Sequence, residues 1–306
     1  MIWSMKTAQA EHSTEFGLFE QNLAGLVKSG KCTMIRHELF TDKRTRTGGE
    51  LYVVKRLAGS FPDYLDRPTP VELQAQIEDM LVDDADPQST AKFYDDWSEK
   101  YDDDLVMVGN YNGYIKCADA LVKLGLNHQV SVLDLAAGTG LLGAEIGRQG
   151  YCNIDGLDSS LGMLGRARAQ GIFKNYIHSR VEGLGSIPVN DESYDVIVSS
   201  NGFAPGQIYP SALPELVRVL RPGGYILIAM KDGYHLTSQR FALMDTVIND
   251  LVVQSKLEML IGPVVFKNFL LNKDGRFYMM RKVTSHKYAC GSPLGSPKTQ
   301  RRGSLH

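Results

Sequence analysis

The chain has 306 residues, of which 43% are hydrophobic, a composition that supports an ordinary globular core. Its net charge of −2 and pI near 6.4 argue against a general nucleic-acid or membrane binder. The four cysteines form no CxxC motif, which argues against a disulfide framework and against a zinc or other metal site. Because the sequence has neither an apolar leader nor a long apolar run, we expect a cytoplasmic protein, with the nucleus as the alternative, and no membrane span.

Residues 1–88 are interpreted as an N-terminal extension without regular alternation of strands and helices. Apolar residues at helical spacing predict a helix over residues 13–27, and two strands are expected within residues 32–57, around Gly48 and Gly49. Residues 69–72 read TPVE, a capping box with proline at the first helical position, which predicts a helix through about residue 81. The sequence of this extension indicates no role.

Residues 89–283 alternate between strands and helices, which predicts a parallel sheet with helices on both faces. Strands are expected near residues 131–135, 154–157, 175–179, 195–199 and 225–230. Helices are expected near residues 111–124, 141–148, 161–170 and 212–220. The predicted fold class is therefore α/β, with a Rossmann-like, doubly wound sheet.

The pattern changes after residue 230. A helix over residues 238–254 is followed by strands at 264–271 and 277–283, and the Asp274-Gly275 pair between them predicts a hairpin turn. The sheet should therefore be mostly parallel with an antiparallel last strand. Residues 284–306 are rich in Ser, Pro, Gly and Arg and are expected to form a disordered tail.

The first predicted strand of the sheet runs directly into a glycine turn. Residues 132–140 read VLDLAAGTG, and residues 156–160, GLDSS, end the next strand in a carboxylate. Glycines let a backbone approach a ligand, a helix N-terminus offers free N–H groups, and the Asp158 carboxylate can hold both hydroxyls of a ribose. These features predict a pocket for a nucleoside-bearing cofactor, although the glycine pattern alone would equally suit NAD, and Asp158 could also cap a helix.

Asp134 bears on the choice of cofactor. A carboxylate four residues before Gly138 suits a cofactor with a positive amino group and would repel the pyrophosphate of a dinucleotide. The alternative is that Asp134 caps the N–H groups of its own loop. Asp134 therefore favours S-adenosyl-L-methionine over NAD.

Three short segments resemble motifs of class I S-adenosylmethionine-dependent methyltransferases. Residues 134–140 resemble their first motif, residues 156–164 their acidic loop and following helix, and residues 221–224, RPGG, their turn into the fifth strand. Residues 93–283 are also similar to the methyltransferase-like protein 27 family of the Williams–Beuren region, most specifically at NGFAPGQ (201–207) and SALPEL (211–216). The resemblance implies a seven-stranded Rossmann-like sheet and methyl transfer.

By this resemblance, Asp134 and the glycine loop would hold the methionine end of the cofactor, Asp158 the ribose, and the Leu184 backbone the adenine. Two departures stand out: Ala136 replaces the first glycine of many relatives, and Gly183 replaces an aspartate that faces the adenine amine. The residues expected to bind the cofactor are Tyr94, Trp97, Tyr101, Asp134, Ala136, Gly138, Gly140, Asp158, Ser159, Gly183, Leu184 and Ser200.

Residues 93–102, FYDDWSEKYD, resemble the segment that covers the cofactor in such enzymes. Aromatic rings there could lie against a sulfonium and exclude water. The alternative is that Tyr94, Trp97 and Tyr101 are the core face of a helix.

Three residues that follow predicted strands are catalytic candidates: Asn201, Tyr209 and His235. Ligands of such sheets bind outside the carboxyl ends of the strands, and His235 could serve as a general base, although a lone loop histidine often faces solvent. His178, within a strand, is expected in the core.

These observations predict a transferase, an S-adenosylmethionine-dependent methyltransferase that acts on an unidentified small molecule or protein. An NAD-dependent oxidoreductase is the first alternative, and Asp134, the terminal hairpin and the aromatic segment oppose it. A non-catalytic, cofactor-binding protein on the same fold is the second alternative, because substrate residues are not fixed by motif in this fold.

Overall fold

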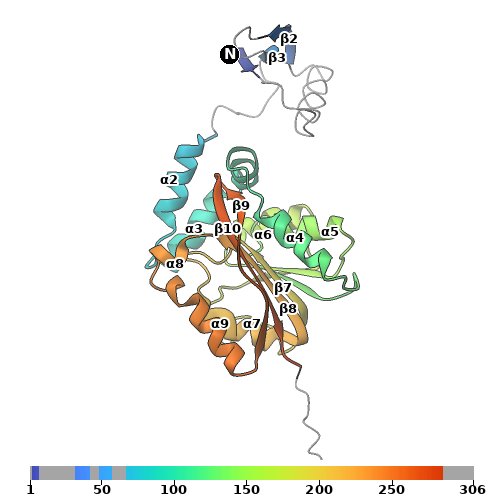
Figure 1. Ribbon diagram of the computed structural model, residues 1–306, viewed down its shortest axis with the longest axis vertical. Helices are drawn as coiled ribbons and strands as arrows, with labels where there is room; N and C mark the ends of the chain where they lie inside the picture. Colours follow the sequence, from blue (N-terminus) through green and yellow to red (C-terminus); the bar gives the residue numbers. More distant parts are fainter. Residues whose placement is uncertain (1, 7–31, 42–47, 57–66, 285–306) are drawn as a thin grey trace, which may run out of the picture. The chain divides into compact units, whose positions relative to one another are not determined.

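The structure is a computed structural model that describes residues 2–6, 32–41, 48–56 and 67–284 (Figure 1). Contacts divide the chain into two compact units, Met1–Arg67 and Pro68–His306. The helix expected over residues 13–27 and nearly all of the tail expected over 284–306 lie outside the described residues. The domain boundary expected at residue 88 stays a prediction.

The first unit contains a three-stranded antiparallel sheet with the order β1-β3-β2. The strands are β1 (Ile2–Lys6), β2 (Cys32–Thr41) and β3 (Gly48–Arg56). The two strands predicted within residues 32–57 are confirmed, whereas β1 had no recognisable pattern in five residues. Gly48 and Gly49 begin β3 rather than forming the turn, because Thr41 already pairs with Gly48.

The second unit is built on a seven-stranded sheet with the order β6-β5-β4-β7-β8-β10-β9. The strands are β4 (Val132–Leu135), β5 (Ile154–Asp158), β6 (Asn175–His178), β7 (Tyr194–Ser200), β8 (Leu220–Lys231), β9 (Leu257–Leu270) and β10 (Lys273–Lys282). The pairs among β6, β5, β4, β7 and β8 are parallel, and β10 pairs antiparallel with both β8 and β9. The predicted fold class is confirmed. Because β4 lies between β5 and β7, the chain reverses its direction of winding there, which is where such sheets bind ligands.

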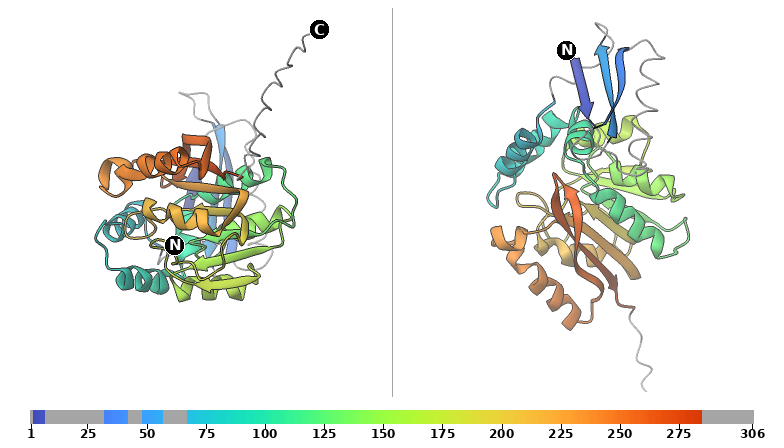
Figure 2. Two further views of the ribbon diagram at one scale, coloured as in Figure 1. Left: turned by 90° about the horizontal axis from the view of Figure 1, so that it is seen from below. Right: turned by 45° about the horizontal axis from the view of Figure 1, so that its top comes forward.

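Helices cover both faces of this sheet, as Figures 1 and 2 show. The helices α4 (Gly113–Lys123) and α5 (Leu141–Arg148) bury one core, and α7 (Leu213–Val219) and α9 (Met244–Val253) bury the other. Successive strand residues point to opposite faces, so along β7 Val196 and Val198 lie in the first core and Ile197 in the second. This double burial explains the near-continuous apolar character of the central strands.

Several further helices border the sheet. They are α2 (Pro70–Met80), α3 (Pro87–Trp97), the π-helical turn η2 (Asp103–Val108), α6 (Leu161–Ala169), α8 (Tyr234–Thr237), and the 3-10 turns η3 (Pro210–Ala212) and η4 (Phe241–Leu243). The capping box predicted for α2 is confirmed: the Glu72 N–H donates to Thr69 Oγ1 at 3.3 Å, and the Thr69 N–H donates to Glu72 Oε2 at 2.7 Å. Asp86 begins α3 in a related way, by accepting from the Ser89 N–H at 2.8 Å. No helix among residues 67–284 has the length and apolar character that a membrane span needs.

The hairpin turn between β9 and β10 lies at Leu271 and Asn272, so its predicted position at Asp274-Gly275 was wrong. Lys273 already pairs with Leu270, and both turn residues have positive φ, 51° and 57°. A two-residue turn with this backbone matches the twist of its strands, and asparagine tolerates it. Gly275 is needed for another reason: a Cβ there would lie 2.4 Å from the Phe266 ring.

Candidate functional site

A cleft lies at the carboxyl ends of β4, β5 and β7. It is partly open to solvent, and a smaller pocket adjoins it. The two share Tyr101, Ala136, Gly138 and Ser200. Their position, outside the carboxyl ends of parallel strands, is where such sheets bind ligands.

Nine of the residues expected in the cofactor site or in catalysis line these two spaces. In the larger cleft they are Tyr94, Tyr101, Ala136, Gly138, Asp158, Ser159, Ser200 and Asn201, and Asp134 lines the smaller pocket. Residues that the sequence separates by more than a hundred positions therefore meet at one edge of the sheet.

Asp158 holds the glycine loop in place. Its Oδ2 accepts from the Gly138 N–H at 2.8 Å, and its Oδ1 accepts from the Ser160 N–H at 2.9 Å. Burial raises the pKa of the Asp158 carboxyl, and the backbone hydrogen bonds oppose that effect only in part. Ser160, rather than Asp158, is the N-cap of α6, because its Oγ accepts from the Met163 N–H. Asp158 lines the cleft.

The turn after β4 has an unusual backbone. Ala136 and Gly138 both have φ near +56°, and Gly140 reaches +95°. A left-handed conformation costs a residue with a Cβ about 1–2 kcal/mol, so Ala136 occupies a position that favours glycine. Gly140 begins α5 and packs against Ile172 rather than lining the cleft.

Asp134 is a buried carboxylate that lacks a full set of partners. Its side chain lines the smaller pocket, the residue is 1% exposed, and its Oδ2 has no hydrogen-bond partner among the described residues. Burial raises the pKa of Asp134 well above its usual value; the charge of Asp158 adds to this, and the Gly143 N–H opposes it. Because an unpaired buried carboxylate is costly, a cationic ligand group in this pocket would stabilise it.

Aromatic residues that precede β4 form one wall of the cleft. Tyr101 lines both spaces, and Tyr94 accepts a 2.6 Å hydrogen bond from Gln207 Nε2 across the larger one. Asp95 fixes α3 to the start of α6, because its Oδ1 accepts from Ser160 Oγ at 2.5 Å and from the Gly162 N–H at 2.8 Å.

Trp97 lies in the core rather than in the cleft. It is 7% exposed, and its indole Nε1 donates to Asp104 Oδ2 at 2.7 Å. Its ring packs against the Tyr101 ring, with centroids 4.8 Å apart. The alternative of a core position therefore describes Trp97, whereas its two tyrosine neighbours reach the cleft.

The residues expected to contact adenine do not line the cleft. Leu184 is 74% exposed, and Gly183 lies beside it in the loop between β6 and β7. Ser179, Arg180 and Val181, at the start of this loop, line the cleft instead.

Of the three catalytic candidates, only Asn201 lines the cleft. It follows β7 with φ +64° and lines the cleft together with Tyr101. Tyr209 instead donates to the Asp83 carbonyl at 2.7 Å and accepts from the Gly206 N–H at 2.7 Å. His235 lies beside Arg276, with Nε2 3.4 Å from Nη2, outside both spaces.

The sequence interpretation missed several residues of the site. Tyr111 and Tyr114 line the smaller pocket, and the Tyr111 hydroxyl lies 2.6 Å from Ser200 Oγ. Both tyrosines lie in the stretch that was predicted only as a helix over residues 111–124. Gln207, which lines the larger cleft, belongs to the NGFAPGQ segment, whose resemblance could have identified it. His178, expected in the core, is exposed because β6 is an edge strand; its Nε2 lies 3.0 Å from the Ser159 carbonyl oxygen.

The sheet order, the glycine loop and the two aspartates at strand ends agree with what the resemblance to class I S-adenosylmethionine-dependent methyltransferases implies. Residues 132–224 match a family model described as a methyltransferase domain, which supports that resemblance.

The comparisons include two curated relatives and a solved structure. The chain is 31% identical to human methyltransferase-like protein 27 over 157 residues, which cover 51% of this chain and 63% of the relative. It is 30% identical to the demethylmenaquinone methyltransferase of Mycobacterium tuberculosis over 148 residues, 47% of this chain and 59% of the relative. The chain thus spans less than two thirds of either relative's length. A solved S-adenosylmethionine-dependent methyltransferase from Mesorhizobium loti is 15% identical, with a TM-score of 0.39 over 56% of this chain and 100% of that one.

Proposed function

We propose that the chain is an S-adenosylmethionine-dependent methyltransferase, with an acceptor that is not yet identified. The observation that carries the proposal is Asp134, a buried carboxylate that lines a pocket next to the Asp158 cleft and has one oxygen without a partner among residues 67–284 and the described strands before them. An ammonium group would supply the missing partner of Asp134, and ribose hydroxyls would find an acceptor in Asp158.

The remaining groups of the cleft fit the same cofactor. When bound, S-adenosylmethionine supplies a methyl group that is already activated on a positively charged sulfur. Tyr101 and Tyr94 would cover the site and exclude water, and the Tyr101 ring would favour a nearby cation. Displacement of the methyl group then depends mainly on orientation, which the cleft walls supply.

The oxidoreductase alternative is less compatible with this pocket. A dinucleotide pyrophosphate next to Asp134 and Asp158 would meet two carboxylates, and Arg180, the cationic side chain among the described residues that line the cleft, is already ion-paired with Glu182. Thermal denaturation with S-adenosylhomocysteine, NAD and NADP separates the two, because a ligand stabilises only the state that binds it. We expect a higher melting temperature with S-adenosylhomocysteine alone; stabilisation by a dinucleotide alone would favour the oxidoreductase.

Asp158→Ala tests the ribose assignment. Loss of charge-assisted hydrogen bonds should cost about 1.5–3 kcal/mol, roughly tenfold to over a hundredfold in affinity for S-adenosylhomocysteine. Calorimetry on the folded variant measures this, and an unchanged dissociation constant would exclude the assignment. A screen of cell extract with labelled S-adenosylmethionine would then separate an enzyme from a non-catalytic binder and identify the acceptor.

A further inference from the structure

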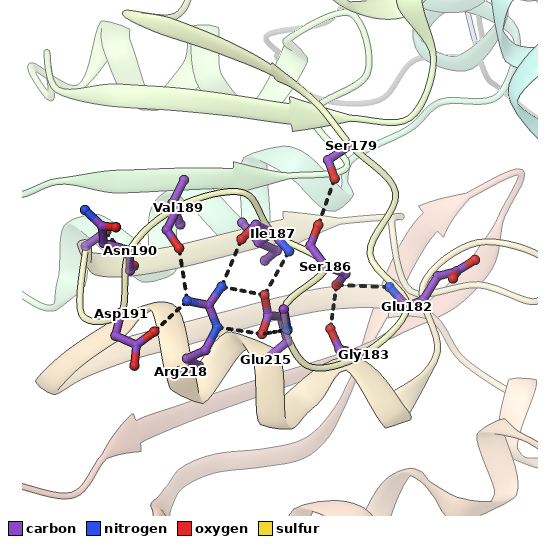
Figure 3. A network of polar contacts seen from close by, with 12 residues as sticks. Ser179, Glu182, Gly183, Ser186, Ile187, Val189, Asn190, Asp191, Glu215 and Arg218 are labelled. Carbon is purple, nitrogen blue, oxygen red and sulfur yellow. Dashed lines mark hydrogen bonds and ion pairs between the residues drawn. The ribbon is translucent and has the colours of Figure 1, made fainter.

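The loop between β6 and β7 connects the cleft to helix α7. Its first residues, Ser179, Arg180 and Val181, line the larger cleft, and its later residues, up to 191, lie against α7 (Figure 3). Although it has no regular secondary structure, its backbone is held by a network of polar side chains.

Glu215 is the centre of this network. It lies in the first turn of α7, is fully buried, and accepts from the Gly185 N–H at 2.7 Å and from the Ile187 N–H at 2.8 Å. Arg218, one turn later, donates to both carboxylate oxygens, at 2.7 and 2.8 Å. Burial raises the pKa of Glu215, but these hydrogen bonds outweigh it and hold the pKa below its usual value.

Arg218 also binds residues further along the loop. Its guanidinium donates to the Ile187 carbonyl at 2.9 Å, to the Val189 carbonyl at 3.0 Å, and to Asp191 Oδ1 at 2.6 Å. The hydrogen-bond partners of the two side chains are therefore each other and this loop (Figure 3).

A second set of hydrogen bonds joins the held part of the loop to the cleft. Ser179 Oγ donates to the Ser186 carbonyl at 2.8 Å, and Ser186 Oγ donates to the Gly183 carbonyl at 2.6 Å. Ser186 precedes Ile187, which Glu215 and Arg218 both bind. Contacts thus run without interruption from α7 to the residue at the edge of the cleft.

A buried ion pair is a weak source of stability, since apolar residues of the same volume often do as well. Its better-supported use is to select one conformation among several. Here the conformation selected is that of the loop that borders the nucleoside side of the cleft, on the far side of Asp158 from the glycine turn.

We propose that Glu215 and Arg218 are positioning residues that set the affinity of the cleft for the base of its nucleoside ligand. They act through the loop backbone and Ser179, and they do not touch the ligand. The inference rests on the proposed function, because it takes the nucleoside to be that of S-adenosylmethionine.

The test compares two probes that differ only in the base. S-Adenosylhomocysteine carries adenine, and S-ribosylhomocysteine lacks it, so the ratio of their dissociation constants measures what the base contributes. For Glu215→Gln we expect the affinity for S-adenosylhomocysteine to fall by about tenfold or more, with little change for S-ribosylhomocysteine. Glu145→Gln is the matched control, because Glu145 and Arg148 form the same spacing of ion pair on α5, away from the cleft, and should keep the wild-type ratio.

A merely structural role of Glu215 makes a different prediction: the affinities for both probes would fall by the same factor, or neither affinity would change. Either result overturns the inference. If Glu215→Gln does not fold, Ser186→Ala is the second variant, because it leaves the ion pair intact and removes the bonds of the Ser186 hydroxyl. It should still reduce the preference of the cleft for S-adenosylhomocysteine over S-ribosylhomocysteine. A wild-type chain that binds neither probe would refute the proposed function instead. A wild-type chain that binds both probes equally would refute the inference alone.

Discussion

Replacing Asp134 by asparagine should separate the stability of the empty domain from its affinity for the cofactor. The carboxylate is 1% exposed, one of its oxygens has no partner within the part of the chain that the structure describes, and burial raises its pKa well above the usual value. In the ligand-free protein it therefore binds a proton at pH values where the unfolded chain, with a carboxyl pKa of about 3.9, has lost it.

The sign of the pH dependence follows from that difference. A raised folded-state pKa contributes stability that is fully present below the unfolded pKa and is lost as the pH rises through the folded pKa. The free energy of unfolding of wild type, relative to Asp134→Asn, should therefore fall with rising pH across that window. Chemical denaturation at a series of pH values measures it.

Binding should reverse the effect, because an ammonium group favours the ionised carboxylate. At pH values below the raised pKa, binding of S-adenosylhomocysteine should then release up to one proton from position 134 of wild type. In Asp134→Asn this position has no carboxyl group and should release none. The lost charge-assisted contact should weaken binding by about 1.5–3 kcal/mol, roughly tenfold to over a hundredfold. Calorimetry in two buffers of different ionisation enthalpy reports both the affinity and the proton release.

Asp104 provides a matched control. It is also buried, at 2% exposure, and also has an unpartnered oxygen among the described residues, but it lines neither part of the site. Asp104→Asn should leave affinity and proton release as in wild type. If Asp134→Asn binds S-adenosylhomocysteine as tightly as wild type does, the carboxylate does not hold the cofactor's amino group and the reasoning is refuted.

Four further substitutions, at three positions, test the cleft walls and the core behind them. Tyr101→Phe should keep the fold and weaken S-adenosylmethionine binding, because it removes a hydroxyl group from the cleft wall. Tyr101→Leu should weaken binding further, because it removes the ring that would favour the sulfonium. Wild-type affinity in both folded variants would make Tyr101 a core residue. Trp97→Phe should lower the free energy of unfolding by about 1–3 kcal/mol, because it removes the 2.7 Å bond to Asp104. The affinity of the folded variant for S-adenosylhomocysteine should stay unchanged. Reduced affinity at wild-type stability would contradict the core position of Trp97. Ala136→Gly should raise the free energy of unfolding by up to about 1 kcal/mol, since φ is +56°, and a clear loss in urea denaturation would count against the backbone argument.

The parts of the fold that follow from local patterns could be predicted from the sequence. The strands of the parallel sheet are apolar runs between turn residues, and the glycine loop with Asp134 and Asp158 follows two of them, so these residues could be placed at one edge of the sheet. β1 and the first half of β9 could not be identified in this way. β1 is a single five-residue strand, and β9 continues through Gly262 and Pro263, residues that usually end a strand.

The catalytic candidates were harder to predict, because a position after a strand fixes where the backbone lies but not the direction of the side chain. Asn201, Tyr209 and His235 all follow strands, yet tertiary contacts direct only the first into the cleft. The Tyr209 hydroxyl bonds to the Asp83 carbonyl, and His235 lies next to Arg276 of β10. Asp83 and Arg276 are far from their partners in sequence, so no local pattern could have predicted either contact.

The segment 93–102 shows why one motif can hold three kinds of residue. Tyr94 lies on α3 and Tyr101 follows the turn at residues 98–100 that ends this helix, yet both line the cleft. Asp95 and Asp102 each follow one of these tyrosines, and both bind loops that border the cleft: Asp95 accepts from Ser160 and Gly162, and Asp102 accepts from Thr139. Trp97, the last residue of α3, packs against both tyrosine rings from the core side. The segment thus carries cleft-lining tyrosines and anchoring carboxylates side by side, so a change in the anchors should be felt in the cleft walls.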